Sequence, residues 1–480
     1  MDNWILKQAA LSPQRIAVDD GQTKLTFSQL VGQLETLAGK LDRIGALNGN
    51  RVAIMTRNSL QGYLMALAAL GSGQTIVWLN WRLADAEIKR QLQDSRPTLC
   101  LVDDQLWRPA FDSQFVKFSD VMGITVSKKP LRSEFAPEAV ASIMYTSGTT
   151  GAPKGVMQTF GNHLASALAS SLNLGVTPKD EWLCAVPIFH ISGFSIMMRG
   201  LIYGMTVRLV AHFDPQTVDR ILTHEPVSTI SVVPYMLKKL LDLLEQRGNR
   251  YNANFRCMLL GGGPIDRQTL TRCQRAEIPV VQSYGMTETC SQIVALNYSD
   301  ADSRIGSVGK PLFLTQIKLA DDSDEILIKT PALTPGYLNR PDALADKKTA
   351  DGWYRTGDIG HFDQDGFLFV DGRIDDMIIS GGENVFPDEI ESVYLARPDI
   401  DEIAVVGADD PEWGQTPVAF VVSDQPLNSH DLIEYGRQRL AHYKVPHRFI
   451  RINQLPMNAG GKVQRFKLKA QLDQSNESLI

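Results

Sequence analysis

Short runs of apolar, β-forming residues alternate with helical segments along most of the chain, and this alternation restricts the fold more than any other feature. The runs lie at 52–55, 75–79, 98–102, 141–145, 206–210, 229–233, 256–260 and 278–282. Helical patterns separate many of them, for example at 236–246. Strands that alternate with helices predict mainly parallel sheets flanked by helices. The loops that bind ligands in such sheets lie at the carboxyl ends of the strands.

The first clear helix is expected to begin at Thr26. Thr26 and Gln29 have the spacing of a capping box, in which each side chain satisfies a backbone N–H of the other residue. Leucines at 30, 34, 37 and 41 then recur with helical spacing. We expect this stripe to lie in the core.

The composition and the pattern of expected elements change beyond about residue 350. Seven glycines crowd into 352–382, and short strands are expected at 403–406, 418–422 and 449–452. Helices are expected at 387–395 and 430–440. We therefore predict an α/β fold with a large N-terminal domain of several subdomains at 1–374 and a small α+β domain at 375–480.

Composition excludes several classes of protein. The chain has 480 residues, of which 44% are hydrophobic and 21% charged, as in ordinary globular proteins. The charge balance, 48 − 54 = −6, gives no basic excess for nucleic acid. Five scattered cysteines form no CxxC pair, so a reducing compartment is favoured.

Membrane and secretory signals are not expected either. The N-terminus lacks a basic and then apolar signal pattern. The most apolar stretch, 63–79, is interrupted by polar residues and glycines at 71–75, whereas a membrane span needs about 20 largely apolar residues. We expect a cytoplasmic protein without a membrane span.

The segment 145–155, which reads YTSGTTGAPKG, is the most informative loop in the sequence. It follows an apolar strand, and its three glycines permit close approach of the backbone to a ligand. Hydroxyls, a lysine and successive N–H groups suit a polyphosphate. The pattern is neither a Walker A loop nor GxGxxG. The phosphate-binding residues expected here are Thr146, Ser147, Gly148, Thr149, Thr150, Gly151 and Lys154.

This loop resembles the phosphate loop of the adenylate-forming superfamily, which includes acyl-CoA and aryl-CoA synthetases, luciferases and carrier-loading adenylation domains. Further family motifs follow in order: YGMTE at 284–288, YRTGD at 354–358, GRIDD at 372–376 and NAGGK at 458–462. The last departs from the family's usual Thr-x-Ser/Thr-Gly-Lys loop, since the lysine is present but the hydroxyls are absent. The resemblance implies that a carboxylate attacks the α-phosphorus of ATP, and that the thiol of coenzyme A then displaces AMP.

The resemblance also implies residue roles in the nucleotide site. Glu288 and Thr149 would hold the Mg²⁺ that accompanies ATP, Tyr284 would stack on adenine, and Asp358 would accept hydrogen bonds from the ribose. Arg373 would support the ribose or phosphate. The remaining ATP- and AMP-binding residues would be Gly261, Gly262, Gly263, Pro264, Ser283, Gly285, Met286 and Thr287.

The C-terminal domain of the family moves between the two half-reactions. The resemblance implies that Lys462 bridges the substrate carboxylate and the α-phosphate during adenylation only, and that Asp375 is the hinge. Rotation would then bring Gly381 and Gly382 toward the coenzyme A channel. Such domain movements can limit turnover.

The acyl site has a closer resemblance. The strings at 158–163, 189–193, 259–264 and 284–293 are similar to those of the o-succinylbenzoate–CoA ligase family of menaquinone biosynthesis. The ring carboxylate of that substrate needs donors or a cation, because a buried anion must be compensated. Ser192 and Thr289 are expected donors, and His190 is expected to shape or gate the pocket. Arg199 lies on the face of Ser192 if this segment is helical, and is our candidate partner for the ring carboxylate.

Other readings stay open at this point. The chain could be a CoA ligase for another aryl or acyl acid, a carrier-loading adenylation enzyme, or a nucleotide sensor without turnover. The end of the chain shortly after the lysine loop, with no appended carrier domain, weakens the second, and Lys462, Glu288 and Asp358 argue against the third. The expected ligands are a small carboxylate, ATP with Mg²⁺, and coenzyme A. Family relatives often form homo-oligomers, although the sequence carries no interface signal.

Overall fold

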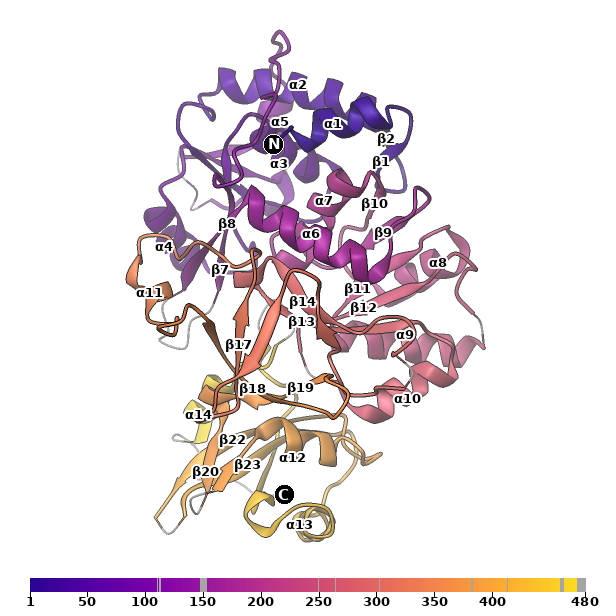
Figure 1. Cartoon of the computed structure of the whole chain (residues 1–480), viewed down its shortest axis with the longest axis vertical. Helices are drawn as coiled ribbons and strands as arrows, with labels where there is room; N and C mark the ends of the chain where they lie inside the picture. Colours follow the sequence, from indigo (N-terminus) through magenta and orange to yellow (C-terminus); the bar gives the residue numbers. More distant parts are fainter. Residues whose placement is uncertain are drawn as a thin grey trace.

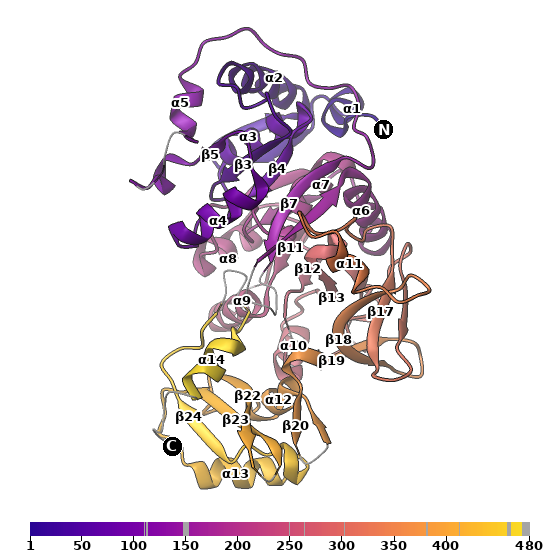
Figure 2. The ribbon, with the colours of Figure 1, turned by 90° about the vertical axis from the view of Figure 1, so that its left-hand side faces the viewer.

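The computed structural model describes residues 1–109, 111, 114–146, 153–248, 250–263, 265–301, 303–380, 383–411, 413–457 and 462–472. A larger N-terminal part lies above a smaller C-terminal domain in Figure 1. Both views place the C-terminal domain at one end of the long axis (Figures 1 and 2).

The first sheet of the N-terminal part has the strand order β6-β5-β3-β4-β7-β8. Strands from β6 to β7 are parallel, and β8 returns antiparallel to β7. The expected phosphate loop therefore connects two paired strands at the edge of this sheet. The strands are β3 (Arg51–Met55), β4 (Thr75–Trp78), β5 (Cys100–Val102), β6 (Phe115–Lys117), β7 (Val140–Thr146) and β8 (Lys154–Thr159).

The second sheet has the order β15-β14-β13-β12-β11-β9-β10-β1-β2. Strands from β13 to β1 are parallel, whereas β2, β14 and β15 pair antiparallel. The strands are β1 (Ile16–Asp19), β2 (Lys24–Thr26), β9 (Glu181–Cys184), β10 (Thr206–Leu209), β11 (Thr229–Val232), β12 (Cys257–Leu260), β13 (Val280–Met286), β14 (Ser291–Ala295) and β15 (Lys310–Pro311). The predicted strand at 278–282 extends further, to Met286, because β14 pairs with its second half.

Helices cover both sheets, and a continuous apolar core lies between them. Helix α2 begins as predicted: Thr26 Oγ1 accepts the Gln29 N–H at 3.2 Å and Gln29 Oε1 accepts the Thr26 N–H at 2.9 Å. Its four leucines are buried. The helices of this part are α1 (Trp4–Leu11), α2 (Phe27–Arg43), α3 (Leu60–Gly71), α4 (Asp85–Ser95), α5 (Phe118–Met122), α6 (Phe160–Leu174), α7 (Ile191–Tyr203), α8 (Pro215–His224), α9 (Pro234–Arg247), α10 (Arg267–Arg275) and the short η1 (Asp104–Leu106).

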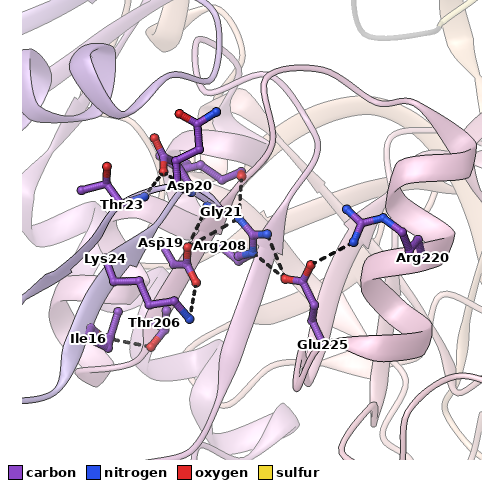
Figure 3. Close-up of polar contacts among 12 residues, drawn as sticks. Ile16, Asp19, Asp20, Gly21, Thr23, Lys24, Thr206, Arg208, Arg220 and Glu225 are labelled. Atoms are coloured by element: carbon purple, nitrogen blue, oxygen red, sulfur yellow. Dashed lines mark hydrogen bonds and ion pairs between the residues drawn. The ribbon is translucent and has the colours of Figure 1, made fainter.

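A charge network around the buried Asp19 and Arg208 lies at the edge of the second sheet (Figure 3). Arg208 on β10 donates to Glu225 at 2.9 Å and lies 3.6 Å from the carboxylate of Asp19 on β1. Asp19 also pairs with Lys24 on β2 at 2.9 Å and accepts the Gly21 N–H at 2.7 Å. Paired and hydrogen-bonded charges can be buried without a large net penalty. The network therefore ties the β1–β2 hairpin to β10 and to the end of α8.

A third, antiparallel sheet has the order β16-β17-β18-β19 and lies between the parallel sheets and the C-terminal domain (Figure 1). The strands are β16 (Gln316–Leu319), β17 (Glu325–Lys329), β18 (Tyr354–Phe362) and β19 (Leu368–Arg373). Two short helical segments accompany it, α11 (Asp342–Ala345) and η3 (Ile374–Asp376). Asp375 lies exposed in η3, between the last strand of this sheet and the first strand of the C-terminal domain. The predicted boundary at 374/375 falls in this turn.

The C-terminal domain is a sheet in the order β21-β20-β23-β22, with β24 paired to β23, and it has its own apolar clusters. Its elements are β20 (Ile378–Ser380), β21 (Glu383–Val385), α12 (Pro387–Tyr394), β22 (Glu402–Asp410), β23 (Gly414–Val422), α13 (Ser429–Arg437), η4 (His442–Lys444), β24 (Arg448–Arg451) and α14 (Arg465–Leu472). These agree with the predicted strands and helices, and the predicted α/β fold class is confirmed. Among the described helices, none has the length and apolarity that a membrane span needs.

Candidate active site

The carboxylate expected to bind the ribose is held firmly where β18 and β19 pair. Asp358 is 7% exposed and accepts the Tyr284 hydroxyl at 2.6 Å. Arg373 Nε lies 3.2 Å from its other oxygen. Although partial burial opposes it, the neighbouring Asp358 raises the pKa of Arg373 above its usual value. The three side chains come from β13, β18 and β19 and meet at one point, so the acceptor is oriented before a nucleotide arrives.

The YGMTE segment forms the end of β13 and a tight turn, η2 (Thr287–Thr289). At Gly285 a Cβ atom would lie 2.1 Å from the Ser291 carbonyl oxygen, so only glycine fits there. Cys290 and Ser291 follow with φ of 53° and 102°, which non-glycine residues rarely adopt. Backbone strain of this kind is commonly found at functional sites.

Glu288 projects from this turn and is oriented by a tyrosine. The Tyr337 hydroxyl donates to Glu288 Oε1 at 2.9 Å and lies 3.3 Å from the Tyr354 hydroxyl. Burial, followed by the charge of Glu288, raises the pKa of Tyr337, so the hydroxyl keeps its proton and acts as a donor. Lys154 Nζ lies 5.6 Å from the centre of the Tyr337 ring. Glu288 and Lys154, which are far apart in sequence, are thus brought together around one side chain.

The glycine run follows β12, as the sequence predicts. Gly262 has a φ of +84°, in the region that favours glycine. Ser283 Oγ on the adjacent strand β13 donates to the Leu260 carbonyl at 2.9 Å. A Cβ at Gly261 would come within 3.1 Å of that hydroxyl. Gly262 and Gly263, which follow the end of β12, are exposed.

Lys462 lies beside this nucleotide site although it belongs to the C-terminal domain. Its surroundings include Arg373 and Asp358 of the third sheet and Asp376 of the turn. Partial enclosure by protein, and then the charge of Arg373, lower the pKa of Lys462, while Asp358 and Asp376 oppose that shift. Lys462 of the C-terminal domain is therefore near enough to Asp358 and Arg373 for their charges to act on it.

Arg199 occupies an unusual environment on the acyl side. Its side chain is 2% exposed in α7, and Nη2 donates to Gln292 Oε1 at 2.9 Å. The guanidinium lies 5.3 Å from the Trp182 ring, and Nε is buried without a hydrogen-bond partner. Across the residues that the structure describes, no carboxylate pairs with it. Burial lowers the pKa of Arg199 from its usual value. Buried arginines are normally paired, so this cation lacks its counter-charge.

The other expected acyl-site residues lie close to α7 or the YGMTE turn. Ser192 and Arg199 share α7, as predicted, and His190 precedes that helix at its N-cap position, without a capping hydrogen bond from its side chain. The His190 Nε2 atom is buried without a partner, and burial lowers the pKa of His190 to about 4. His190 is therefore neutral at physiological pH. Thr289 differs from the expectation of a ligand donor, because its fully buried hydroxyl bonds to the Met286 and Ser291 carbonyls within the turn.

Some expected site residues lie outside the described residues. They are Ser147, Gly148, Thr149, Thr150 and Gly151 of the phosphate loop, Pro264 after the glycine run, and Gly381 and Gly382 of the coenzyme A channel. Thr146, at the end of β7, and Lys154, at the start of β8, flank the phosphate loop.

Sequence reasoning missed three residues that support the site. Tyr337 orients Glu288, and Gln158 on β8 donates to the Thr287 carbonyl at 2.9 Å. Glu325 on β17 is buried and accepts the Gly357 N–H at 2.9 Å, next to Asp358. A buried acid in an apolar strand was the available signal for Glu325. The contacts of the other two depend on pairing between distant segments, which leaves no local pattern.

The donor set fits a magnesium ion that arrives with ATP rather than a separate metal centre. Glu288 offers one carboxylate oxygen that Tyr337 does not occupy. Magnesium bound to nucleotides typically takes one or two carboxylates plus phosphate oxygens and water. Elsewhere in the described chain, no group of three or more histidines, cysteines or acidic residues could hold a metal. The five cysteines are buried and free.

Comparison with known proteins places these features in a family. The family model for AMP-binding enzymes matches residues 5–338, and the model for their C-terminal domain matches 389–462. A 2-succinylbenzoate–CoA ligase from Listeria monocytogenes is 44% identical over 472 residues, covering 98% of this chain and 99% of the relative.

Solved structures of o-succinylbenzoate CoA synthetase from Bacillus subtilis are also similar. The complex with the acyl-adenylate intermediate is 38% identical with a TM-score of 0.93, covering 100% of this chain and 99% of the other. The complex with ATP and magnesium is 39% identical with a TM-score of 0.91, covering 98% and 99%. A double mutant of the same synthetase, bound to a product analogue, is 39% identical to this chain and covers 98% of this chain and 98% of its own. Its TM-score is 0.75.

The motifs, the two matched family models and the full-length similarity agree with one another. The chain therefore belongs to the AMP-binding enzyme family, with both the large domain and the C-terminal domain of that family.

Proposed function

We propose that this chain joins o-succinylbenzoate to coenzyme A in two steps, through an acyl-adenylate. ATP and the acid would give acyl-AMP and pyrophosphate, and coenzyme A would then displace AMP to give the thioester. The full-length relative is named as a ligase of this acid, and a similar structure holds its acyl-adenylate. The enzyme would act in the cytoplasm, which supplies ATP and coenzyme A. A homo-oligomeric state stays a prediction.

The observation that carries the choice of acid is the buried guanidinium of Arg199. The proposed substrate has two carboxylates, of which one is activated and the other must be held as an anion. A cation that is 2% exposed and lacks a carboxylate partner within the described chain offers that compensation. Its unpaired Nε supplies a donor for the ring carboxylate. A monocarboxylic acid would leave this charge uncompensated.

The nucleotide side of the reaction depends on groups that are fixed in advance. Asp358 would accept hydrogen bonds from the ribose hydroxyls, and Arg373 and Tyr284 hold it in place. Glu288 would hold the magnesium ion, which neutralises phosphate charge when bound, and Tyr337 keeps that carboxylate oriented. Donors and acceptors that need no rearrangement lower the cost of reaching a charged transition state.

Lys462 would act in adenylation. Its ammonium lies in the electrostatic neighbourhood of Asp358 and Arg373, so it would reach the acid and the α-phosphate bound between them. The domain arrangement supports this assignment. At nearly equal identity, this structure matches the relative holding acyl-adenylate at a TM-score of 0.93 and the relative holding a product analogue at 0.75. We infer that it represents the adenylating arrangement, and that rotation at Asp375 would follow.

The test is pyrophosphate release with ATP, Mg²⁺ and coenzyme A, together with the mass of the thioester. The acids would be o-succinylbenzoate, benzoate, succinate and 4-oxo-4-phenylbutanoate, the last being the same molecule without the ring carboxylate. We expect o-succinylbenzoate to have the highest kcat/KM and to form a mono-thioester. A preference for another acid would refute the specific assignment. Pyrophosphate release without a CoA thioester would favour a carrier-loading enzyme.

A further inference from the structure

A buried arginine three residues after Lys462 binds three carboxylates that come from two separate elements. Arg465 Nη2 donates to Asp388 at 2.7 Å and to Glu391 at 2.8 Å, both on α12. Its Nη1 lies 3.4 Å from Asp376 in η3, beside the hinge. The Arg465 side chain is 11% exposed. Arg465 is the first residue of α14.

The same arginine is fastened to the sheet of the C-terminal domain. Its Nε donates to the Val405 carbonyl on β22 at 3.3 Å, and Glu391 accepts the Val405 N–H at 2.7 Å. Leu468, one turn further along α14, is fully buried. The guanidinium of Arg465 is thus held by the backbone of β22, by the acids of α12 and by Asp376 beside the hinge. These contacts fix the position at which α14 begins.

Lys462 lies three residues before Arg465 in the sequence. The base of its loop is closed by a bridge between Met457 and Val463 and by a hydrogen bond from the Gln464 N–H to the Pro456 carbonyl at 2.7 Å. Two residues therefore separate the lysine from the fixed Arg465. In Figures 1 and 2, α14 lies at the edge of the C-terminal domain that faces the larger part of the molecule.

Arg465 also affects Lys462 through its charge. Asp376 and Asp388 act electrostatically on Lys462 as well as on Arg465. An ammonium and a guanidinium therefore compete for the same acids. Arg465 forms close, charge-assisted bonds to the acids of α12, so the guanidinium already compensates their charge.

We propose that Arg465 is a positioning residue that joins the hinge to the lysine loop and keeps Lys462 directed at the bound acid and nucleotide during adenylation. This proposal rests on the two-step function above. It adds a role for a residue that touches no reactant. Removal of Arg465 would leave Asp376 and Asp388, the two acids that also act on Lys462, without their guanidinium partner, and would release the start of α14.

The experiment measures each half-reaction in the full-length chain. Adenylation is followed by ATP–pyrophosphate exchange, and thiolysis by CoA thioester formation from supplied acyl-AMP. In Arg465→Met we expect adenylation kcat to fall about 100-fold, the size expected when a reacting group is displaced by about 1 Å. Thiolysis should change by less than about threefold, because Lys462 is not needed there. Arg465→Lys should recover part of the loss, since it keeps one charge.

Two further variants separate positioning from mere stability. Asp388→Asn combined with Arg465→Met should regain adenylation, because one of the competing acids is gone. Arg437→Met serves as the matched control, since Arg437 lies in the same domain and forms one exposed pair with Glu434 at 2.8 Å. Equal loss in both half-reactions, or no recovery in the double variant, would overturn the proposal. If Arg465→Met does not fold, the same comparison is made in Arg465→Lys, that is, the loss in adenylation rate relative to the loss in thiolysis rate.

This outcome is distinguishable from failure of the proposed function. If the unmodified chain activates a different acid, the two half-reactions are measured with that acid, and the ratio still tests Arg465. If the unmodified chain makes acyl-AMP but no CoA thioester, the proposed ligase function fails, and adenylation with rescue by Asp388→Asn still tests the positioning role.

Discussion

Replacing Tyr337 with phenylalanine isolates one hydrogen bond to the carboxylate that would hold magnesium. The hydroxyl donates to Glu288 at 2.9 Å, and Tyr337 is 3% exposed. The ring remains, so the contact with Lys154 and the packing around it are kept. A hydrogen bond to a charged group contributes about 1.5–3 kcal/mol. If that energy is expressed in the transition state, adenylation should slow by roughly 10- to 150-fold.

The assay is the initial rate of pyrophosphate release at saturating ATP and acid over a range of Mg²⁺ concentrations. We expect a higher Mg²⁺ requirement as well as a lower rate, because Glu288 becomes free to rotate. The control is Tyr394→Phe, which removes a buried hydroxyl that donates to the neutral Leu432 carbonyl at 3.0 Å in the C-terminal domain. A rate within twofold of the unmodified chain, or an equal loss in both variants, would refute the role of Tyr337.

Three more changes test two other residues of the site, Lys462 and Arg199, and a buried histidine of α6, His163. Lys462→Ala should abolish ATP–pyrophosphate exchange and largely spare thiolysis of supplied acyl-AMP; equal losses would contradict a role confined to adenylation. Arg199→Met should raise the KM for o-succinylbenzoate by about 10- to 150-fold without raising the KM for ATP, because a charged hydrogen bond is lost. The free protein should not lose stability, since an unpaired buried charge is removed; an unchanged KM for the diacid would exclude Arg199 from the pocket. His163, whose pKa burial lowers from 6.5 to about 3, should contribute stability that is present above pH 6.5 and is lost as the pH falls toward 3. In His163→Gln, urea unfolding should therefore show a smaller loss of unfolding free energy between pH 7 and pH 4, by about 3 kcal/mol at pH 4; identical curves would contradict the assignment.

Local patterns predicted much of the framework. The capping box at Thr26 and the leucine stripe that follows it depend only on neighbouring residues, and both are present as expected. The alternation of strands and helices predicted the parallel sheets. This prediction also depends on local patterns, because the periodicity of apolar residues indicates which face of each element is buried. Strand ends were less predictable. β13 continues to Met286 because β14 pairs with it, and no residue within β13 encodes that partner.

The site divides in the same way. Motif residues such as Glu288, Asp358 and Lys462 could be proposed from the sequence because each lies in a short local string that resembles a family motif. Their orientation could not, since Tyr337 comes from a distant loop. Thr289 shows the limit clearly: a hydroxyl next to the site looks like a ligand donor, but the turn uses it for backbone carbonyls.

Residue chemistry in the sequence indicated a loop that suits a polyphosphate, because such binding requires particular side chains at particular spacings, and the family resemblance of the motifs implied an adenylating enzyme with a mobile lysine. The environment of those side chains came from folding. Arg199 reads as an ordinary surface arginine until α7 packs into the core, where no carboxylate among the described residues pairs with its charge. Arg465 reads as one more cation in a basic helix until η3, α12 and β22 converge on it. Burial and charge compensation depend on segments far apart in sequence, and only their assembly brings those segments into contact.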